Sequence, residues 1–330
     1  MQTRVVLGVA VIALALFPLV AGKFGIDLAT KIMIFAILAL SLELLVGQTG
    51  LVCFGQAAFF GIGAYGVVLL SPESEAASFF WLAPVAVLFA TLYALFVGAL
   101  SLRTRGIYFI MVTLAFAQMA YYVFHDTPLG RGTDGIYLYV KPAAAVAGQV
   151  LVDLDRPVPY YYVVLGALVL TFAFLATLLR SRFGRALAGI KANEQRMRAA
   201  GYSTYVYKLA AFTLSGAIAG FAGVLFAVKD GFVNPELLAW HLSGSVLVMI
   251  ILGGLGHLSG AVIGAFAYVL LQELFQSQAV FGALAKHWLL GLGLTIIAMV
   301  ALLPGGLAGA PAELRRRLAR RPERTVDADA

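Results

Sequence analysis

Residues 28–46 read LATKIMIFAILALSLELLV, an apolar run in which only Lys31 and Glu43 carry charge. A helix needs about 20 mostly apolar residues to cross the hydrocarbon core of a bilayer. The sequence therefore predicts an all-α, polytopic transmembrane bundle of about 8 to 10 spans, in which short runs are broken, re-entrant or buried by neighbours. Further candidate spans are 5–22, 51–70, 80–100, 107–124, 160–179, 209–228, 241–254, 258–276 and 287–303.

The composition of the whole chain supports this fold class. Of 330 residues, 62% are hydrophobic and 12% are charged, and the mean hydropathy is +0.95. Soluble domains are nearer half apolar and a quarter charged, so lipid must cover part of this surface. The net charge of +7 therefore informs topology rather than nucleic-acid binding. The only cysteine, Cys53, excludes an intramolecular disulfide and is expected to be a packing residue.

The distribution of basic residues predicts the orientation. With the N-terminus in the cytoplasm, sixteen of the 23 Lys and Arg residues fall on the inside, as bacterial inner-membrane proteins prefer. Both termini are then cytoplasmic. The apolar start of the chain to Gly22 resembles a signal peptide, but we expect an uncleaved first span because later spans already target the membrane.

Three segments stand apart within this architecture. The transmembrane domain is expected to cover residues 1–310. Within it, the Pro- and Gly-rich segment 125–159 faces outward, and the densely basic loop 180–208 faces the cytoplasm. The charged tail 311–330 lacks aromatic residues and is expected to be disordered.

The sequence argues against several short motifs with known chemistry. Gly61-Ile-Gly63-Ala-Tyr-Gly66 matches the dinucleotide fingerprint, but it lies inside an apolar span, where glycines serve close helix packing. The chain lacks a G-x-x-x-x-G-K-[ST] phosphate loop and an H-E-x-x-H motif, and its four histidines are scattered. We therefore expect neither an enzyme, a metal site nor a cofactor in this chain, and any ATP hydrolysis must come from a partner.

Small and polar residues inside the spans carry more information. Glycines at four-residue spacing (216 and 220; then 256, 260 and 264) predict flat helix faces for close packing or sliding. Polar side chains in hydrocarbon are costly, so they mark a transport path. The candidates are Glu43, Gln56, Thr113 and Gln118. Glu43 and Gln56 flank the turn 47–50 and are expected at similar depth, where they bond or line one cavity. A carboxylate snorkelling to water is the alternative for Glu43.

The sequence also resembles a known family. The blocks SLELLVGQTGL (41–51) and GQAAFFGIGAY (55–65) resemble the signature of branched-chain amino acid ABC transporter permeases, the LivM/LivH family. The order of RGIYF (105–109) followed by GTDG (132–135) resembles a LivM-like rather than a LivH-like subunit. Further matching blocks follow in order: RGIYF (105–109), TLAF (113–116), GTDG (132–135), FGRAL (183–187), Ala200-Gly201, YKLAAF (207–212) and LGGLG (252–256) with Gly260.

The resemblance implies the membrane subunit of an ATP-driven importer in the bacterial inner membrane. Its partners would be cytoplasmic ATP-binding subunits, a second permease subunit that is LivH-like, and a periplasmic solute-binding protein received by 125–159. The implied cargo is branched-chain or related small amino acids. Glu43 and Gln56 stand where the family commonly has asparagine and histidine, which leaves urea, amides or aromatic acids open as cargo. A secondary transporter remains a further alternative, although the deep polar residues are mostly neutral.

The resemblance also assigns the basic loop 184–201 as an ATPase-coupling helix. Leu187, Ile190 and Met197 share one helical face, and Gly201 is a natural helix stop. Glu194 with the following Ala-Ala-Gly loosely resembles the acidic-Ala-Ala-Gly loop of importer permeases, though the spacing differs. A helix lying on anionic lipid is the alternative. The candidate coupling residues are Gly184, Arg185, Leu187, Glu194, Ala200 and Gly201.

Overall fold

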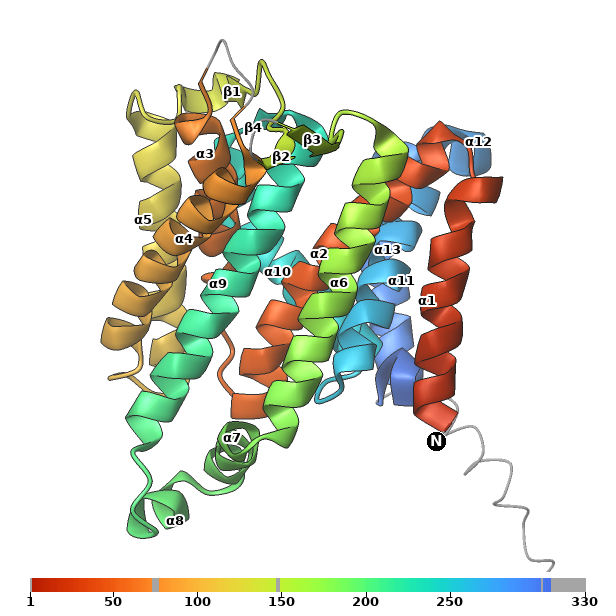
Figure 1. Cartoon of the computed structure of the whole chain (residues 1–330). Coiled ribbons are helices and arrows are strands. Elements are labelled where there is room, and N and C mark those ends of the chain that lie inside the picture. The colour runs from red at the N-terminus through yellow and green to blue at the C-terminus, as the bar shows by residue number, and fades with distance from the viewer. Residues whose placement is uncertain (1, 73–76, 147–148, 304, 310–330) are drawn as a thin grey trace, which may run out of the picture.

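The computed structural model describes residues 2–72, 77–146, 149–303 and 305–309 (Figure 1). The tail 311–330 lies outside these residues. Within them, seven helices are long and apolar enough to cross a membrane, and three shorter apolar helices accompany them. These helices coincide with the ten predicted spans and confirm the helical bundle. They are α1 (Gln2–Val20), α2 (Lys23–Thr49), α3 (Gln56–Leu70), α4 (Phe79–Ser101), α5 (Ile107–Asp126), α6 (Pro157–Arg180), α9 (Thr204–Asp230), α10 (Trp240–Gly253), α11 (Leu258–Gln276) and α13 (Trp288–Leu302).

Helices α2 and α9 form the centre of the bundle. In the most apolar stretch of each, 83% and 78% of residues are buried, against 33% or less in the other long helices. The outer helices keep one apolar face for lipid, which explains their many exposed leucines and phenylalanines. The polar residues carried by α2 and α9 are therefore held inside the protein.

Glycines bring α3 and α9 into backbone contact. A Cβ atom built on Gly63 would lie 2.1 Å from the carbonyl oxygen of Gly220, and one on Gly223 would lie 1.9 Å from that of Phe60. Gly216 and Gly220 also face alanines of α4. Gly260 and Gly264 of α11 approach the backbone at the end of α10 equally closely. The predicted flat faces are confirmed, except that Gly256 lies in the α10–α11 loop with φ of +90°.

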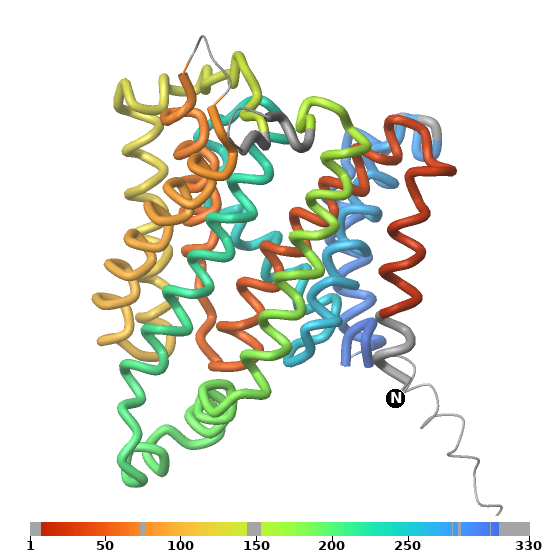
Figure 2. The backbone as a smooth tube through the Cα atoms, in the orientation of Figure 1, coloured from red at the N-terminus to blue at the C-terminus, as the bar shows by residue number. Residues whose placement is uncertain are grey.

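Two of the short helices begin inside the bundle. The segment 50–55 is not helical and rises from the end of α2 into the interior, where α3 begins at Gln56 (Figure 2). The predicted span 51–70 therefore starts too early, because helix α3 begins only at Gln56. The tight turn expected before it is also wrong, since the non-helical segment 50–55 takes its place. Helix α10 also starts in the middle of the bundle (Figure 1). With 15 and 14 residues, α3 and α10 extend only about 22 Å and 21 Å.

The connections gather at the two ends of the bundle. At one end lie two short antiparallel pairs, β1 (Ile136–Tyr137) with β4 (Phe232–Val233) and β2 (Ala144–Val146) with β3 (Gln149–Val152). At the opposite end lie α7 (Arg182–Ala192) and α8 (Glu194–Ala199), with the start of α1 (Figure 1). The segments 125–159 and 180–208 thus occupy opposite ends. Short helices η1 (Gly132–Asp134), η2 (Pro235–Leu238), α12 (Gln278–Phe281) and η3 (Gly282–His287) complete the chain.

Candidate translocation path and coupling segment

A chain of hydrogen bonds joins the three central helices at the start of α3. Gln56 Nε2 donates to Ser215 Oγ over 2.7 Å, and Ser215 Oγ donates to the Ser41 carbonyl over 2.6 Å. The amide of Ala57, in the first turn of α3, donates to Ser243 Oγ of α10 over 2.9 Å. The first turn of a helix leaves backbone amides without partners inside the helix. At the start of α3, a side chain of the same protein pairs with one of these amides, as a segment away from water requires. Gln56 is fully buried, and no described residue pairs with its Oε1.

Glu43 forms its hydrogen bond with the α10–α11 loop and not with Gln56. Its Oε1 accepts a hydrogen bond from the Gly256 amide over 2.7 Å, and Gln48 Nε2 donates to the Gly256 carbonyl over 3.3 Å. Glu43 is fully buried, so it does not snorkel to water. Its Oε2 has no hydrogen-bond partner within the described part of the chain. The structure gives Glu43 and Gln56 separate partners, although Gln56 reaches the level of Ser41, two residues away on α2.

The two candidates on α5 serve different places. Thr113 is buried, donates to the Ile110 carbonyl over 2.9 Å and accepts from the Phe54 amide over 3.3 Å. It therefore supports the segment that leads into α3. Gln118 is partly buried and lines a groove of about 550 Å³ on the flank of the bundle. The other lining residues are Tyr121, Tyr122, Glu236, Ala239, Trp240 and His241.

The groove contains functional candidates that the sequence did not reveal. Glu236, Trp240 and His241 lie more than a hundred residues from Gln118, at the edge of a predicted span. The packing of η2 and α10 against α5 brings them together. The signal available beforehand was the acid-aromatic-histidine cluster just before the unusually short run 241–254.

The coupling segment consists of two helices instead of the single helix expected. Ser181 Oγ accepts from the amides of Phe183 and Gly184 at the start of α7. Asn193 ends α7, and its Oδ1 accepts from the Arg196 amide over 2.9 Å to begin α8. Asparagine competes with the helix for backbone hydrogen bonds, which explains the break.

The apolar face of this segment packs on the bundle of the same chain, which the sequence did not predict. Leu187 and Ile190 are buried, and Met197 covers Gly189, which folds α8 onto α7. Gly184 is also buried, because a Cβ there would lie 2.3 Å from the Leu179 carbonyl oxygen. These residues position the segment and are not available for a partner.

The exposed end of the segment is formed by α8 and its cap. Arg185, Ala200 and Gly201 are exposed. Gly201 adopts φ of +87°, its amide donates to the Arg198 carbonyl, and the Tyr202 amide donates to the Met197 carbonyl. This is the left-handed glycine termination that the sequence predicted.

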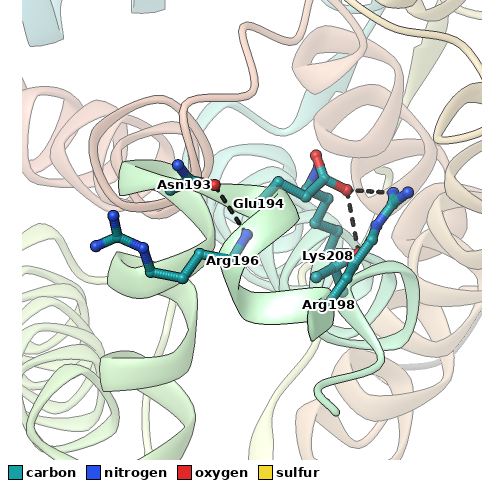
Figure 3. A network of polar contacts seen from close by, with 6 residues as sticks. Asn193, Glu194, Arg196, Arg198 and Lys208 are labelled. Atoms are coloured by element: carbon teal, nitrogen blue, oxygen red, sulfur yellow. Dashed lines mark hydrogen bonds and ion pairs between the residues drawn. The ribbon is translucent and has the colours of Figure 1, made fainter. Parts of the chain in front are cut away.

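Glu194 ties α8 to the first turns of α9 (Figure 3). Its carboxylate contacts Lys208 Nζ at 2.6 Å, Arg198 Nη2 at 2.5 Å and Thr204 Oγ1 at 3.1 Å. We call Glu194, Arg198, Thr204 and Lys208 the latch. Burial raises the pKa of Glu194, but the hydrogen bond and charge of Lys208, with the hydrogen bonds of Arg198 and Thr204, outweigh it and hold the pKa at about 2. A lowered carboxyl pKa stabilises the fold fully above the unfolded value of 4.5, and this contribution is lost progressively as pH falls from there through about 2. The latch is therefore fully ionised at any physiological pH.

A second tie connects α7 to α2. Lys191 Nζ donates to the Gly47 carbonyl over 2.6 Å, four residues beyond Glu43. Lysine at this position also neutralises the negative end of α2. The coupling segment is thus fastened to both central helices, through Lys191 to α2 and through Glu194 to α9.

Comparison with known proteins places these features in a family. Residues 24–310 match the profile of the "Branched-chain amino acid transport system / permease component" family. The chain is 32% identical over 319 residues to the high-affinity branched-chain amino acid transport system permease protein LivM of Escherichia coli K12, covering 91% of this chain and 73% of LivM. The LivM of Salmonella typhimurium is 32% identical over 325 residues, covering 93% and 75%.

A more distant relative matches only part of the chain. The autoinducer 2 import system permease protein LsrC of Escherichia coli K12 (DH10B) is 36% identical over 100 residues, or 29% of each chain. No solved structure matches the chain.

Proposed function

This chain belongs to the branched-chain amino acid transport system permease family, and we propose that leucine, isoleucine and valine are what it moves across the membrane. As an ABC importer permease it is a multi-pass inner-membrane transport subunit and not an enzyme, and ATP hydrolysis takes place in separate ATPase subunits. The proposed cargo rests on the similarity to LivM, which extends over 91% of this chain. Urea, amides, aromatic acids and the secondary-transporter alternative are not favoured.

The proposed assembly contains two permease subunits, the second of them LivH-like. ATPase and binding-protein partners follow from membership of an ABC importer family. In this proposal the binding protein docks on the segment 125–159 and the ATPase docks on α7 and α8. The position of these segments at opposite ends of the bundle supports the arrangement (Figure 1).

The two ties of the coupling segment suggest how ATPase closure reaches the path. A displaced α8 pulls on α9 through Glu194 and Lys208, and a displaced α7 pulls on α2 through Lys191. Ser215 of α9 accepts from Gln56 at the start of α3 and donates to the Ser41 carbonyl of α2, so it links all three helices. Relative movement of α2 and α9 therefore acts on Gln56, where helix α3 is interrupted. Gln56, Gln118, Thr113 and Glu43 are the proposed polar elements along this route.

Uptake by the reconstituted importer tests the proposed cargo. We expect proteoliposomes containing this chain, its partner permease, the ATPases and the loaded binding protein to accumulate labelled leucine in an ATP-dependent manner. The control is the same complex with an ATPase unable to hydrolyse ATP. Uptake of urea or an aliphatic amide without uptake of leucine, isoleucine or valine would overturn the proposal.

Reporter fusions test the proposed orientation, with both termini in the cytoplasm. Alkaline phosphatase folds into an active enzyme only outside the cytoplasm. We expect a fusion after Val140 to be active and a fusion after Lys191 to be inactive. Val140 lies between β1 and β2 and Lys191 lies in α7, and these elements are at opposite ends of the bundle (Figure 1). The reverse pattern would invert the topology and, with it, the assignment of the docking surfaces.

A further inference from the structure

The groove beside α5 combines groups that do not suit a surface facing lipid. It is lined by α5, by η2 with the residue that follows it, and by the beginning of α10. The Glu236 side chain is exposed, and none of the described residues gives its carboxylate an ion pair or hydrogen bond. Gln118 Oε1 is covered but likewise lacks a partner in the described chain. An acid and an amide without partners are costly against hydrocarbon and mark a water-filled or protein-covered surface.

The chemistry of the groove complements a small zwitterion with an apolar side chain. Glu236 and Gln118 offer oxygen acceptors for an ammonium group. The Tyr121 and Tyr122 hydroxyls and the His241 ring supply hydrogen-bond donors for a carboxylate. Trp240 stacks on His241 with ring centroids 4.3 Å apart, and its exposed indole provides an apolar wall. A volume of about 550 Å³ is in the range of small-molecule sites.

We propose that this groove is the chain's part of the amino acid path, and that Glu236 and Gln118 receive the ammonium group of the passing amino acid. The inference rests on the proposed function and adds to it a location and a recognition group. Charge makes the difference between the two acceptors: a carboxylate binds an ammonium ion more strongly than an amide does. Glu236 thus favours α-amino acids over carboxylic acids of the same shape.

The first experiment compares two acids of the same bundle. Glu236→Gln removes the negative charge in the groove, whereas Glu273→Gln removes an acid from α11 that does not line it. In reconstituted importer, normalised to complexes that co-purify with their ATPase, we expect Glu236→Gln to lower leucine uptake about tenfold, as loss of one charged hydrogen bond does. Glu273→Gln should stay within about twofold of the unaltered chain. Equal uptake by both variants would overturn the proposal.

The second experiment asks what the groove faces, independently of cargo. Tyr122→Cys should react with a membrane-impermeant maleimide in the assembled importer, and reaction should slow when leucine-loaded binding protein and ATP are present. Reaction only with a lipid-soluble maleimide would place the groove against lipid and end the proposal. Failure of the unaltered importer to take up leucine would refute the proposed function instead, while water-accessible labelling of Tyr122→Cys would still support a path.

Discussion

Leucine in place of Gly223 should prevent the bundle from assembling and leave no measurable uptake. The Cβ atom alone would lie 1.9 Å from the Phe60 carbonyl oxygen and 3.1 Å from the Ala64 amide nitrogen. Both are backbone atoms of α3, so no rotamer change can relieve the contact. Overpacking a well-packed core commonly costs about 1–3 kcal/mol and more where the backbone must move. Here α3 and α9 would have to separate along their tightest contact.

The matched control is the same substitution on the outer surface. A Cβ on Gly166 of α6 meets nothing within 4 Å, and Gly166 is exposed on the outside of that helix. We expect Gly166→Leu to purify, elute as a single species and melt like the unaltered chain, whereas Gly223→Leu aggregates or is degraded. A monodisperse Gly223→Leu protein with unchanged melting temperature would show that α3 and α9 are not packed in this way.

The same glycines show how much of the fold the sequence contains. Apolar runs located the seven long and three shorter apolar helices of the described residues, because hydrocarbon forces every spanning segment to satisfy its own backbone. The four-residue spacing of Gly216 and Gly220 predicted the flat face of α9. It did not identify the partner helices, since spacing defines a face but not what covers it. The bonds of Gly256 to Glu43 and Gln48 were hidden for the same reason.

The polar interior was less accessible to prediction than the helices. Gln56 could be identified because an amide side chain is unusual in an apolar run. Its partner Ser215 could not, because it lies 159 residues away and a single serine in an apolar helix is common. The late start of α3 removed the tight turn expected at 47–50. Asn193, by contrast, is a preferred helix N-cap, so the division into α7 and α8 was available from sequence. Glu236 was missed because only tertiary packing places it beside Gln118.

Reversing the charge of Glu194 is expected to uncouple ATP hydrolysis from transport. Glu194→Lys would place a cation against Lys208 and Arg198, which now lie 2.6 Å and 2.5 Å from its carboxylate. The side chains of Lys208 and Glu194 are only 16% and 27% exposed, so solvent screens the repulsion incompletely. An ion pair of this intermediate exposure contributes about 1–2 kcal/mol, between exposed and buried pairs. We expect α8 to detach from α9 while α7 stays attached through Leu187 and Lys191.

The measurement is the number of leucine molecules taken up per ATP hydrolysed. Glu194→Lys should lower this ratio about tenfold or more, and the exchanged pair Glu194→Lys with Lys208→Glu should recover much of it, because neighbouring charges couple non-additively. Recovery separates a mechanical latch from a direct contact between Glu194 and the ATPase, which the exchange would leave broken. Since the low pKa of Glu194 keeps the latch ionised, the ratio for the unaltered chain should not change between pH 6 and pH 8, about four to six pH units above the pKa of about 2. A Glu194→Lys importer that couples normally would show that force passes through α7 and Lys191 alone.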